Sequence, residues 1–296
     1  MNPTKPKSYI TRFIIYTYVL FLLLLLSFGG IAKVLLHGTP LAMRFLIAIT
    51  AWTSTYVFLL MFKKLYPNRT VKEFYIHAFK EKINSRLLVT TIVIQMIIFA
   101  FSVFMVYFQN GFGTINLLDF SFSTIISGLF FTLIQGATGE ETGWRGYLLP
   151  AVEKKIGIVK ASVIVSLIWS FWHAPIWFLD SGYLGIELVQ YIAVFVICIT
   201  SLGFIIGICY HWCHNLLIPI ALHFTFNFLG VMFKGDLIEL VTWYAVFYFI
   251  VAVGFYLWHR IMLKKSQKIA ASMPENDPLV SAKNVFDTDN YFQVRK

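Results

Sequence analysis

Long unbroken apolar runs constrain this 296-residue chain more than any other feature of its sequence. A helix needs about 20 apolar residues to cross a bilayer, and its backbone polar groups must be satisfied inside the hydrocarbon. Only α-helices and closed β-barrels meet that requirement, and these runs are too long and too continuous for barrel strands. The sequence therefore predicts an all-α, polytopic transmembrane helix bundle. Its eight expected spans are residues 12–34, 42–62, 87–108, 121–149, 160–178, 186–209, 214–232 and 238–261.

Composition argues against a soluble globular protein. Hydrophobic residues make up 58% of the chain and charged residues 13%, and that charged share is about half of what an ordinary soluble domain carries. A protein of this size cannot bury so much apolar surface in a core, so much of it must face lipid. The first run, residues 13–31, is too long for a typical signal peptide, and no convincing cleavage site follows Gly29. We therefore expect it to be retained as the first span.

The net charge of +10 would favour a nucleic-acid partner in a soluble protein, but here the basic residues lie in alternate loops between the spans. Lysines and arginines recur in segments 63–86, 154–160 and 260–268, whereas Lys234 is the single cation in the opposite loops. This asymmetry predicts a cell-membrane protein with both termini in the cytoplasm. The cations are expected to contact anionic lipid, and no nucleic-acid partner is expected.

The chain divides by hydropathy into four parts, with no clear internal repeat of the kind that transporters use. Residues 1–120 are expected to form N-terminal transmembrane helices, and 121–232 a helical core that carries the candidate site. Residues 233–265 would form the last transmembrane helix. Residues 266–296 are polar and lack a helical period, which predicts a disordered cytoplasmic tail.

Ionisable side chains inside the fourth span need a reason, because each costs at least about 2.5 kcal/mol to insert. Glu141 and Arg145 are four residues apart and can pair on one helix face. Glu140 points roughly 100° away, so a local salt bridge at a helix end would leave it unexplained. A stripe of small residues, where another helix can approach closely, follows the same helix: Gly136, Gly139, Gly143 and Gly146.

Two further spans contain polar residues of the same kind. The fifth contains His173, close to a kink expected at Pro175, because proline removes a backbone hydrogen bond. The seventh contains His223 and Asn227, which share a helix face. Taken singly, each histidine also fits a packing role between helices. Together with Glu140 they reach a similar depth, which favours one polar site between the fourth, fifth and seventh spans.

These residues also resemble the three motifs of the CPBP family, which contains the CAAX prenyl endopeptidases of the Rce1 type and the bacterial Abi membrane proteins. The motif residues are Glu140, Glu141, Arg145, Trp169, His173, His223 and Asn227. The similarity covers about residues 121–232, and the first three spans and the tail match nothing specific. Trp169 stands where the family usually has Phe, a departure that keeps an aromatic ring and is not expected to alter the chemistry.

Amide hydrolysis needs a nucleophile, a proton acceptor and stabilisation of the oxyanion. These spans offer no plausible Ser–His or Cys–His pair, so an activated water is the expected nucleophile. Glu140 is predicted to be the general base, and His173 to hold or share the water. His223 and Asn227 are predicted to donate to the oxyanion. The resemblance implies the same division of labour.

The Glu141–Arg145 pair is expected to order the helix and to keep the local charge near balance. No cofactor is expected, and Zn²⁺ held by Glu140 and two histidines is the mechanistic alternative. A second, weaker metal candidate lies in the connection between the sixth and seventh spans, for which a polar turn is the simpler account. Its residues are Cys209, His211, Cys213 and His214. With Cys198, the three cysteines give no disulfide framework.

The sequence thus favours an intramembrane endopeptidase acting on membrane-associated peptides or proteins. The alternative is a non-catalytic membrane scaffold or bacteriocin-immunity protein of the same family, which would use the polar cluster only for assembly. A transporter with a buried proton relay is a third hypothesis, and it would predict repeats and broken helices in both halves. Prenylated C-terminal peptides, bacterial leader or signalling peptides and bacteriocin-related peptides all remain open as substrates, and so does the oligomeric state.

Overall fold

The structure is a computed structural model that describes residues 7–34, 37, 39–112, 116–179 and 181–271, and every regular element in these ranges is helical. The helices, with η marking π-helical segments, are α1 (Lys7–Val34), α2 (Pro40–Ala51), α3 (Thr53–Leu65), α4 (Val71–Ala78), α5 (Ser85–Gln109), α6 (Phe122–Thr132), η1 (Leu133–Ala137), α7 (Thr138–Glu141), η2 (Thr142–Leu148), α8 (Leu149–Ile156), α9 (Ile158–Trp172), α10 (Ala174–Leu179), α11 (Gly185–Cys213), α12 (Leu217–Val231) and α13 (Leu237–Ala271). The predicted polytopic helix bundle is confirmed.

Seven of the described helical segments are long and apolar enough to cross a membrane, which makes this an integral, multi-pass membrane protein. The predicted seventh span, 214–232, is instead the shorter apolar helix α12. Its first residues form a turn in which His214 has a left-handed backbone, with φ 47°. The Asn215 amide donates to two carbonyl oxygens of the α4–α5 connection, at 3.1 and 2.6 Å. Because these residues hold a loop, the helix begins only at Leu217.

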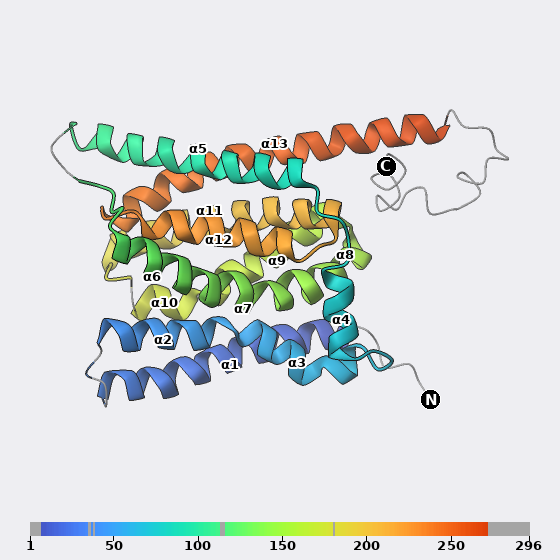
Figure 1. Cartoon of the computed structure of the whole chain (residues 1–296), viewed down its shortest axis with the longest axis horizontal. Helices are drawn as coiled ribbons and strands as arrows, with labels where there is room; N and C mark the ends of the chain where they lie inside the picture. Colours follow the sequence, from blue (N-terminus) through green and yellow to red (C-terminus); the bar gives the residue numbers. More distant parts are fainter. Residues whose placement is uncertain (1–6, 35–36, 38, 113–115, 180, 272–296) are drawn as a thin grey trace.

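The helices lie side by side in three layers (Figure 1). Helices α5 and α13 form one face, α1, α2 and α3 form the opposite face, and α6, α7, α9, α11 and α12 lie between them. Contacts of α11 with α13 and of α12 with α5 join the first face to the middle layer, and contacts of α3 with α7 and η2 join the opposite face to it. The first described residues of α1 and the last of α13 lie at the same end of the bundle as α4 and α8.

The helix that carries Glu140 and Glu141 is interrupted by two π-helical segments, η1 and η2, one on each side of these residues. A wider helical turn disturbs the regular hydrogen-bond ladder, and an unpaired carbonyl is costly in hydrocarbon. Two side chains from the α2–α3 junction supply partners. Trp52 Nε1 donates to Ile134 O at 2.7 Å, and Ser54 Oγ donates to Glu140 O at 3.0 Å. The junction therefore holds the irregular segment in place.

The predicted glycine stripe is confirmed as a surface of close helix approach. A Cβ added at Gly139 would lie 2.6 Å from Trp52 Cδ1, and one added at Gly143 would lie 2.6 Å from the backbone carbon of Ser54. Gly136 faces α12 in the same way. No real side chain tolerates such distances, so the stripe is what lets α3 and α12 reach the irregular helix.

Two predicted boundaries differ from the structure. The fourth helix was expected to end at residue 149 but continues to Ile156 and stops at Gly157, whose φ is 75°. Glu140 therefore lies near the middle of this helix and farther from its end than the predicted boundary placed it. The last helix continues past residue 265 to Ala271, because the segment is rich in good helix formers. The rest of the predicted tail, residues 272–296, lies outside the described residues.

Helix α4 was missed by the sequence reading, which treated this segment as a loop. Thr70 and Glu73 form a capping box: Glu73 N donates to Thr70 Oγ1 at 3.2 Å, and Thr70 N donates to Glu73 Oε2 at 2.8 Å. The bonds from Thr70 hold the pKa of the Glu73 carboxyl below its usual value. The spacing Thr-x-x-Glu was visible in the sequence and is a known helix-start signal.

We predict that Gly143→Ala lowers the thermal stability of the purified protein. The added methyl meets Ser54 backbone, and overpacking of this kind costs about 1–3 kcal/mol. The matched control is Gly254→Ala in α13, where an added Cβ has nothing among the described residues within 4 Å. The melting temperature in detergent should fall for Gly143→Ala and should not fall for Gly254→Ala. Equal melting temperatures for the two variants would contradict the close approach.

Candidate functional site

A cavity of about 200 Å³ lies where the irregular helix, α9, α11 and α12 meet. It is lined by all four predicted catalytic residues, namely Glu140, His173, His223 and Asn227. Most of the other lining groups are apolar or aromatic, including Phe21 and Trp172. Residues from three different helices are thus brought to one small, mainly apolar space inside the bundle.

Glu141 is the centre of a buried charged cluster beside this cavity. Arg145 Nη1 lies 3.0 Å from Glu141 Oε1, as the spacing predicted, and His223 Nδ1 lies 2.8 Å from the same oxygen. The exposed fractions of Glu141 and Arg145 are 0% and 1%. Because the carboxylate accepts from both partners, it is neutralised and joins α12 to the irregular helix. The contact with His223 was not predicted.

Glu140 has a different environment from its neighbour. Its Oε2 accepts a 2.5 Å hydrogen bond from Trp169 Nε1 on α9, and its side chain lines the cavity. No other side-chain hydrogen bond to this carboxyl is present among the described residues. The two adjacent carboxylates are therefore separated as the sequence predicted, Glu141 in an ion pair and Glu140 facing the cavity.

His173 lies at a break in the fifth span. Helix α9 ends at Trp172 and α10 begins at Ala174, so the interruption expected near Pro175 falls on the histidine itself. His173 Nδ1 lies 2.9 Å from Trp169 O. A carbonyl oxygen only accepts, so Nδ1 carries the proton and the neutral ring keeps Nε2 as an acceptor. The ring is thereby oriented for a proton-accepting contact in the cavity.

Asn227 and His223 present nitrogen atoms to Gly136 on the irregular helix. A Cβ added at Gly136 would lie 2.7 Å from Asn227 Nδ2 and 2.8 Å from His223 Nε2. The two nitrogens thus lie over the same backbone position, on one face of α12. Because His223 Nδ1 is engaged with Glu141, its Nε2 donates a hydrogen bond only when the ring is doubly protonated. The Asn227 amide donates at any pH.

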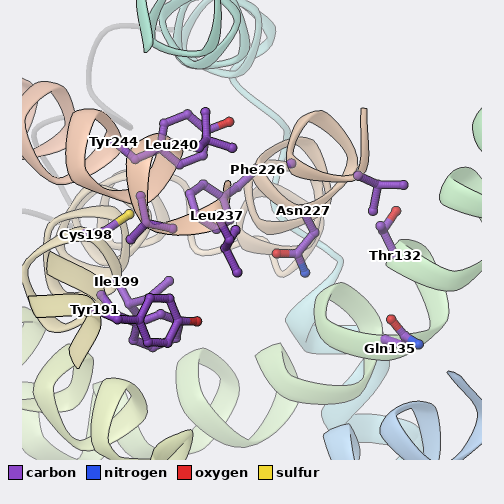
Figure 2. Close-up of a pocket in the computed structure, with 14 residues that line it drawn as sticks. Thr132, Gln135, Tyr191, Cys198, Ile199, Phe226, Asn227, Leu237, Leu240 and Tyr244 are labelled. Carbon is purple, nitrogen blue, oxygen red and sulfur yellow. The ribbon is translucent and has the colours of Figure 1, made fainter. Parts of the chain in front are cut away.

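A second cavity, of about 360 Å³, adjoins the first (Figure 2). Residues that line both cavities are Gln135, Phe195, Ile199, Phe226 and Asn227. In Figure 2 Asn227 lies between Thr132 and Gln135 on one side and Leu237, Leu240 and Tyr244 of α13 on the other. The polar site therefore continues into an apolar space between α11, α12 and α13.

The positions of the His, Cys, Asp and Glu side chains bear on the zinc alternative. No group of three or more His, Cys, Asp or Glu side chains within the described ranges lies close enough together to hold a metal ion. His211 of the second candidate cluster lies 2.6 Å from Glu153 Oε1. All three cysteines are buried and free, in agreement with the prediction that they form no disulfide framework. Within the described residues, the donor sets therefore do not fit a zinc site.

Comparison with known proteins agrees with the position of this site. Residues 121–229 match the family model described as Type II CAAX prenyl endopeptidase Rce1-like. The central helices of this chain are thus similar to that family of endopeptidases. The matched segment begins at the residue where the predicted core begins, and it contains every candidate residue from Glu140 to Asn227.

A curated relative shows the same similarity. A protein named CAAX prenyl protease 2 from Methanococcus maripaludis is 33% identical over 112 residues. The aligned segment covers 36% of this chain and 41% of the relative, so the chain spans less than half the length of the curated relative it matches. This similarity therefore concerns only part of each protein.

Two features of the candidate site were missed by sequence reasoning. Trp169 was treated as an aromatic substitute for Phe, but its indole donates to Glu140. Ser54 and Trp52, outside the matched segment, bind the backbone around the carboxylates. Trp169 could have been recognised, because an indole has a donor that a phenyl ring lacks. No sequence signal pointed to Trp52 or Ser54.

We predict that the two adjacent glutamates, Glu140 and Glu141, differ in their effect on stability. Glu141→Gln leaves the buried Arg145 charge without a counter-ion, and breaking a buried pair costs about 3–5 kcal/mol. Glu140→Gln keeps an oxygen that accepts from Trp169 and should cost far less. Melting temperatures of the two purified variants measure the difference. Equal losses, or a larger loss for Glu140→Gln, would contradict this assignment of partners.

Proposed function

We propose that this chain is an intramembrane endopeptidase that hydrolyses peptide bonds of membrane-associated substrates. The observation that carries the proposal is the pair of adjacent buried carboxylates with separate partners. Glu141 is neutralised by Arg145 and His223, which leaves Glu140 to face a cavity that also contains His173 and Asn227. The similarity of the core to a family of CAAX prenyl endopeptidases supports the same conclusion.

In this mechanism a water molecule in the cavity attacks the scissile carbonyl. Glu140 takes the proton from that water as general base, and His173 Nε2 accepts a hydrogen bond that holds the water. Charge then develops on the carbonyl oxygen, where a preorganised neutral donor is most effective. Asn227 is the constant donor to this oxyanion, and His223 donates as well when its ring is doubly protonated. The general base finally passes its proton to the leaving amine.

The substrate is proposed to carry an apolar group next to the cleaved bond. The second cavity is lined mainly by apolar and aromatic side chains and shares a wall with the candidate site. A lipid chain or a large apolar side chain fits that chemistry. The name of the relative, CAAX prenyl protease 2, supports a prenylated protein as one member of this class.

We further propose that the end of the bundle with α4 and α8 faces the cytoplasm. Lysines and arginines gather there, including Lys82 and Lys154, and cytoplasmic loops carry such an excess. A thiol reagent that cannot cross the membrane should label Lys82→Cys in inverted vesicles and the exposed Leu184→Cys in intact cells. The reverse pattern would contradict this orientation.

Cleavage of a fluorogenic peptide library by protein in liposomes tests the proposed reaction. Glu140→Gln removes the base and should lower kcat by roughly 10²–10⁴-fold. Asn227→Ala removes the oxyanion donor and should lower it by roughly 10²–10³-fold. Glu187→Gln, an exposed residue in the first turn of α11, is the matched control and should cleave like the wild type.

A zinc chelator separates the two chemical alternatives. Cleavage that survives the chelator agrees with a water activated by Glu140 alone, whereas chelator-sensitive cleavage would make the same residues metal ligands. If Glu140→Gln cleaves as fast as the wild type, the proposed mechanism is wrong. If it also keeps the full cellular phenotype, a non-catalytic scaffold or immunity role replaces the endopeptidase.

A further inference from the structure

Trp169 contacts four polar residues of the candidate site, namely Glu140, Arg145, His173 and His223. It is buried on α9, one helical turn before His173, and its indole Nε1 donates to Glu140 Oε2 at 2.5 Å. The Arg145 guanidinium lies 4.4 Å from the centre of its ring. The His223 ring meets it edge-on, with centroids 5.0 Å apart.

The same residue also orients His173 through its main chain. Trp169 O lies 2.9 Å from His173 Nδ1, which fixes the proton on Nδ1 and leaves Nε2 for the cavity. One residue thus contacts the proposed base through its side chain and the proposed water ligand through its carbonyl. The carbonyl contact is available to any residue, whereas the indole contact requires tryptophan.

We propose that Trp169 is a positioning residue for Glu140. Its N–H fixes one carboxylate oxygen, so that the other is turned toward the cavity where the water is activated. A carboxylate whose rotation is restricted in this way is preorganised for proton transfer. The family that this chain resembles usually has Phe at this position. A phenyl ring has no hydrogen-bond donor and cannot hold the carboxylate. The inference rests on the proposed function for its catalytic consequence, but the hydrogen bond itself is independent of it.

The chain offers a matched control for the loss of an indole N–H. Trp177 on α10 is also buried, but its Nε1 has no hydrogen-bond partner within the described part of the chain. Trp169→Phe and Trp177→Phe therefore remove the same atoms from two buried tryptophans. Only the first change removes a bond to a carboxylate.

The hydrogen bond is tested by NMR of protein with ¹⁵N-labelled indoles in lipid nanodiscs. The Trp169 and Trp177 indole signals are assigned by their absence in the two Phe variants. Glu140→Gln replaces a charged acceptor with a neutral one, which should weaken the bond and shift the Trp169 proton signal upfield. The Trp177 signal should stay in place. An unmoved Trp169 signal would overturn the proposal.

The catalytic consequence is tested on the library peptide that the wild type cleaves fastest. Trp169→Phe should lower kcat by roughly 10–100-fold, the range expected for loss of a hydrogen bond to a charged group. KM should stay within about twofold, because the indole contacts the base and not the substrate. In a Glu140→Gln background the same change should have no further effect.

Three results would overturn the positioning role, namely an unchanged kcat, a rise in KM alone, or an equal loss in Trp177→Phe. A fourth outcome combines two results: the wild type cleaves nothing, and the Trp169 signal shifts in Glu140→Gln. It would contradict the proposed function and with it the positioning role. In that case the hydrogen bond would stand as a structural contact. The two failures are therefore distinguishable.

Discussion

The structure depends on the buried charged cluster formed by Glu141, Arg145 and His223. A charge would be costly alone inside an apolar bundle, and the cluster is tolerated because one carboxylate oxygen accepts from nitrogens of both Arg145 and His223. The contact joins α12 to the irregular helix. The cluster also determines the environment of Glu140, because Arg145 and His223 both pair with the neighbouring Glu141.

The irregular backbone around the carboxylates follows from the same constraint. Glu140 and Glu141 lie between two π-helical segments, and because adjacent helical residues point about 100° apart, Glu141 contacts α12 while Glu140 contacts α9. Such segments are frequent at functional sites. They are stable here because Trp52 and Ser54 donate to backbone carbonyls of the irregular helix. Gly139 and Gly143 allow these two residues to come close enough to do so.

The sequence predicted those parts of the site that depend on local spacing. Glu141 and Arg145 pair because they are four residues apart, and the chain breaks at His173 because Pro175 follows. Hydropathy was sufficient for the bundle and for seven of its eight spans. The remaining one, the predicted seventh span, is short because of a turn around Asn215.

Contacts between distant segments could not be predicted in the same way. Helical periodicity indicates which face a residue occupies, but it does not identify the neighbour on that face. The contact between Trp169 and Glu140 joins residues 29 positions apart, and that between His223 and Glu141 joins residues 82 positions apart. The π-helical segments were missed for a related reason, since their backbone is supported by residues of α2 and α3 far along the chain.

The central claim is that Glu140 activates a water and does not itself attack the substrate. The most direct test is a single turnover in H₂¹⁸O, with enzyme in excess over a cleavable peptide, followed by mass spectrometry of the new carboxyl group. Direct attack by water places one ¹⁸O in the product of the first turnover. A first-turnover product that contains only ¹⁶O would show that an enzyme carboxylate supplied the oxygen, and would contradict the account.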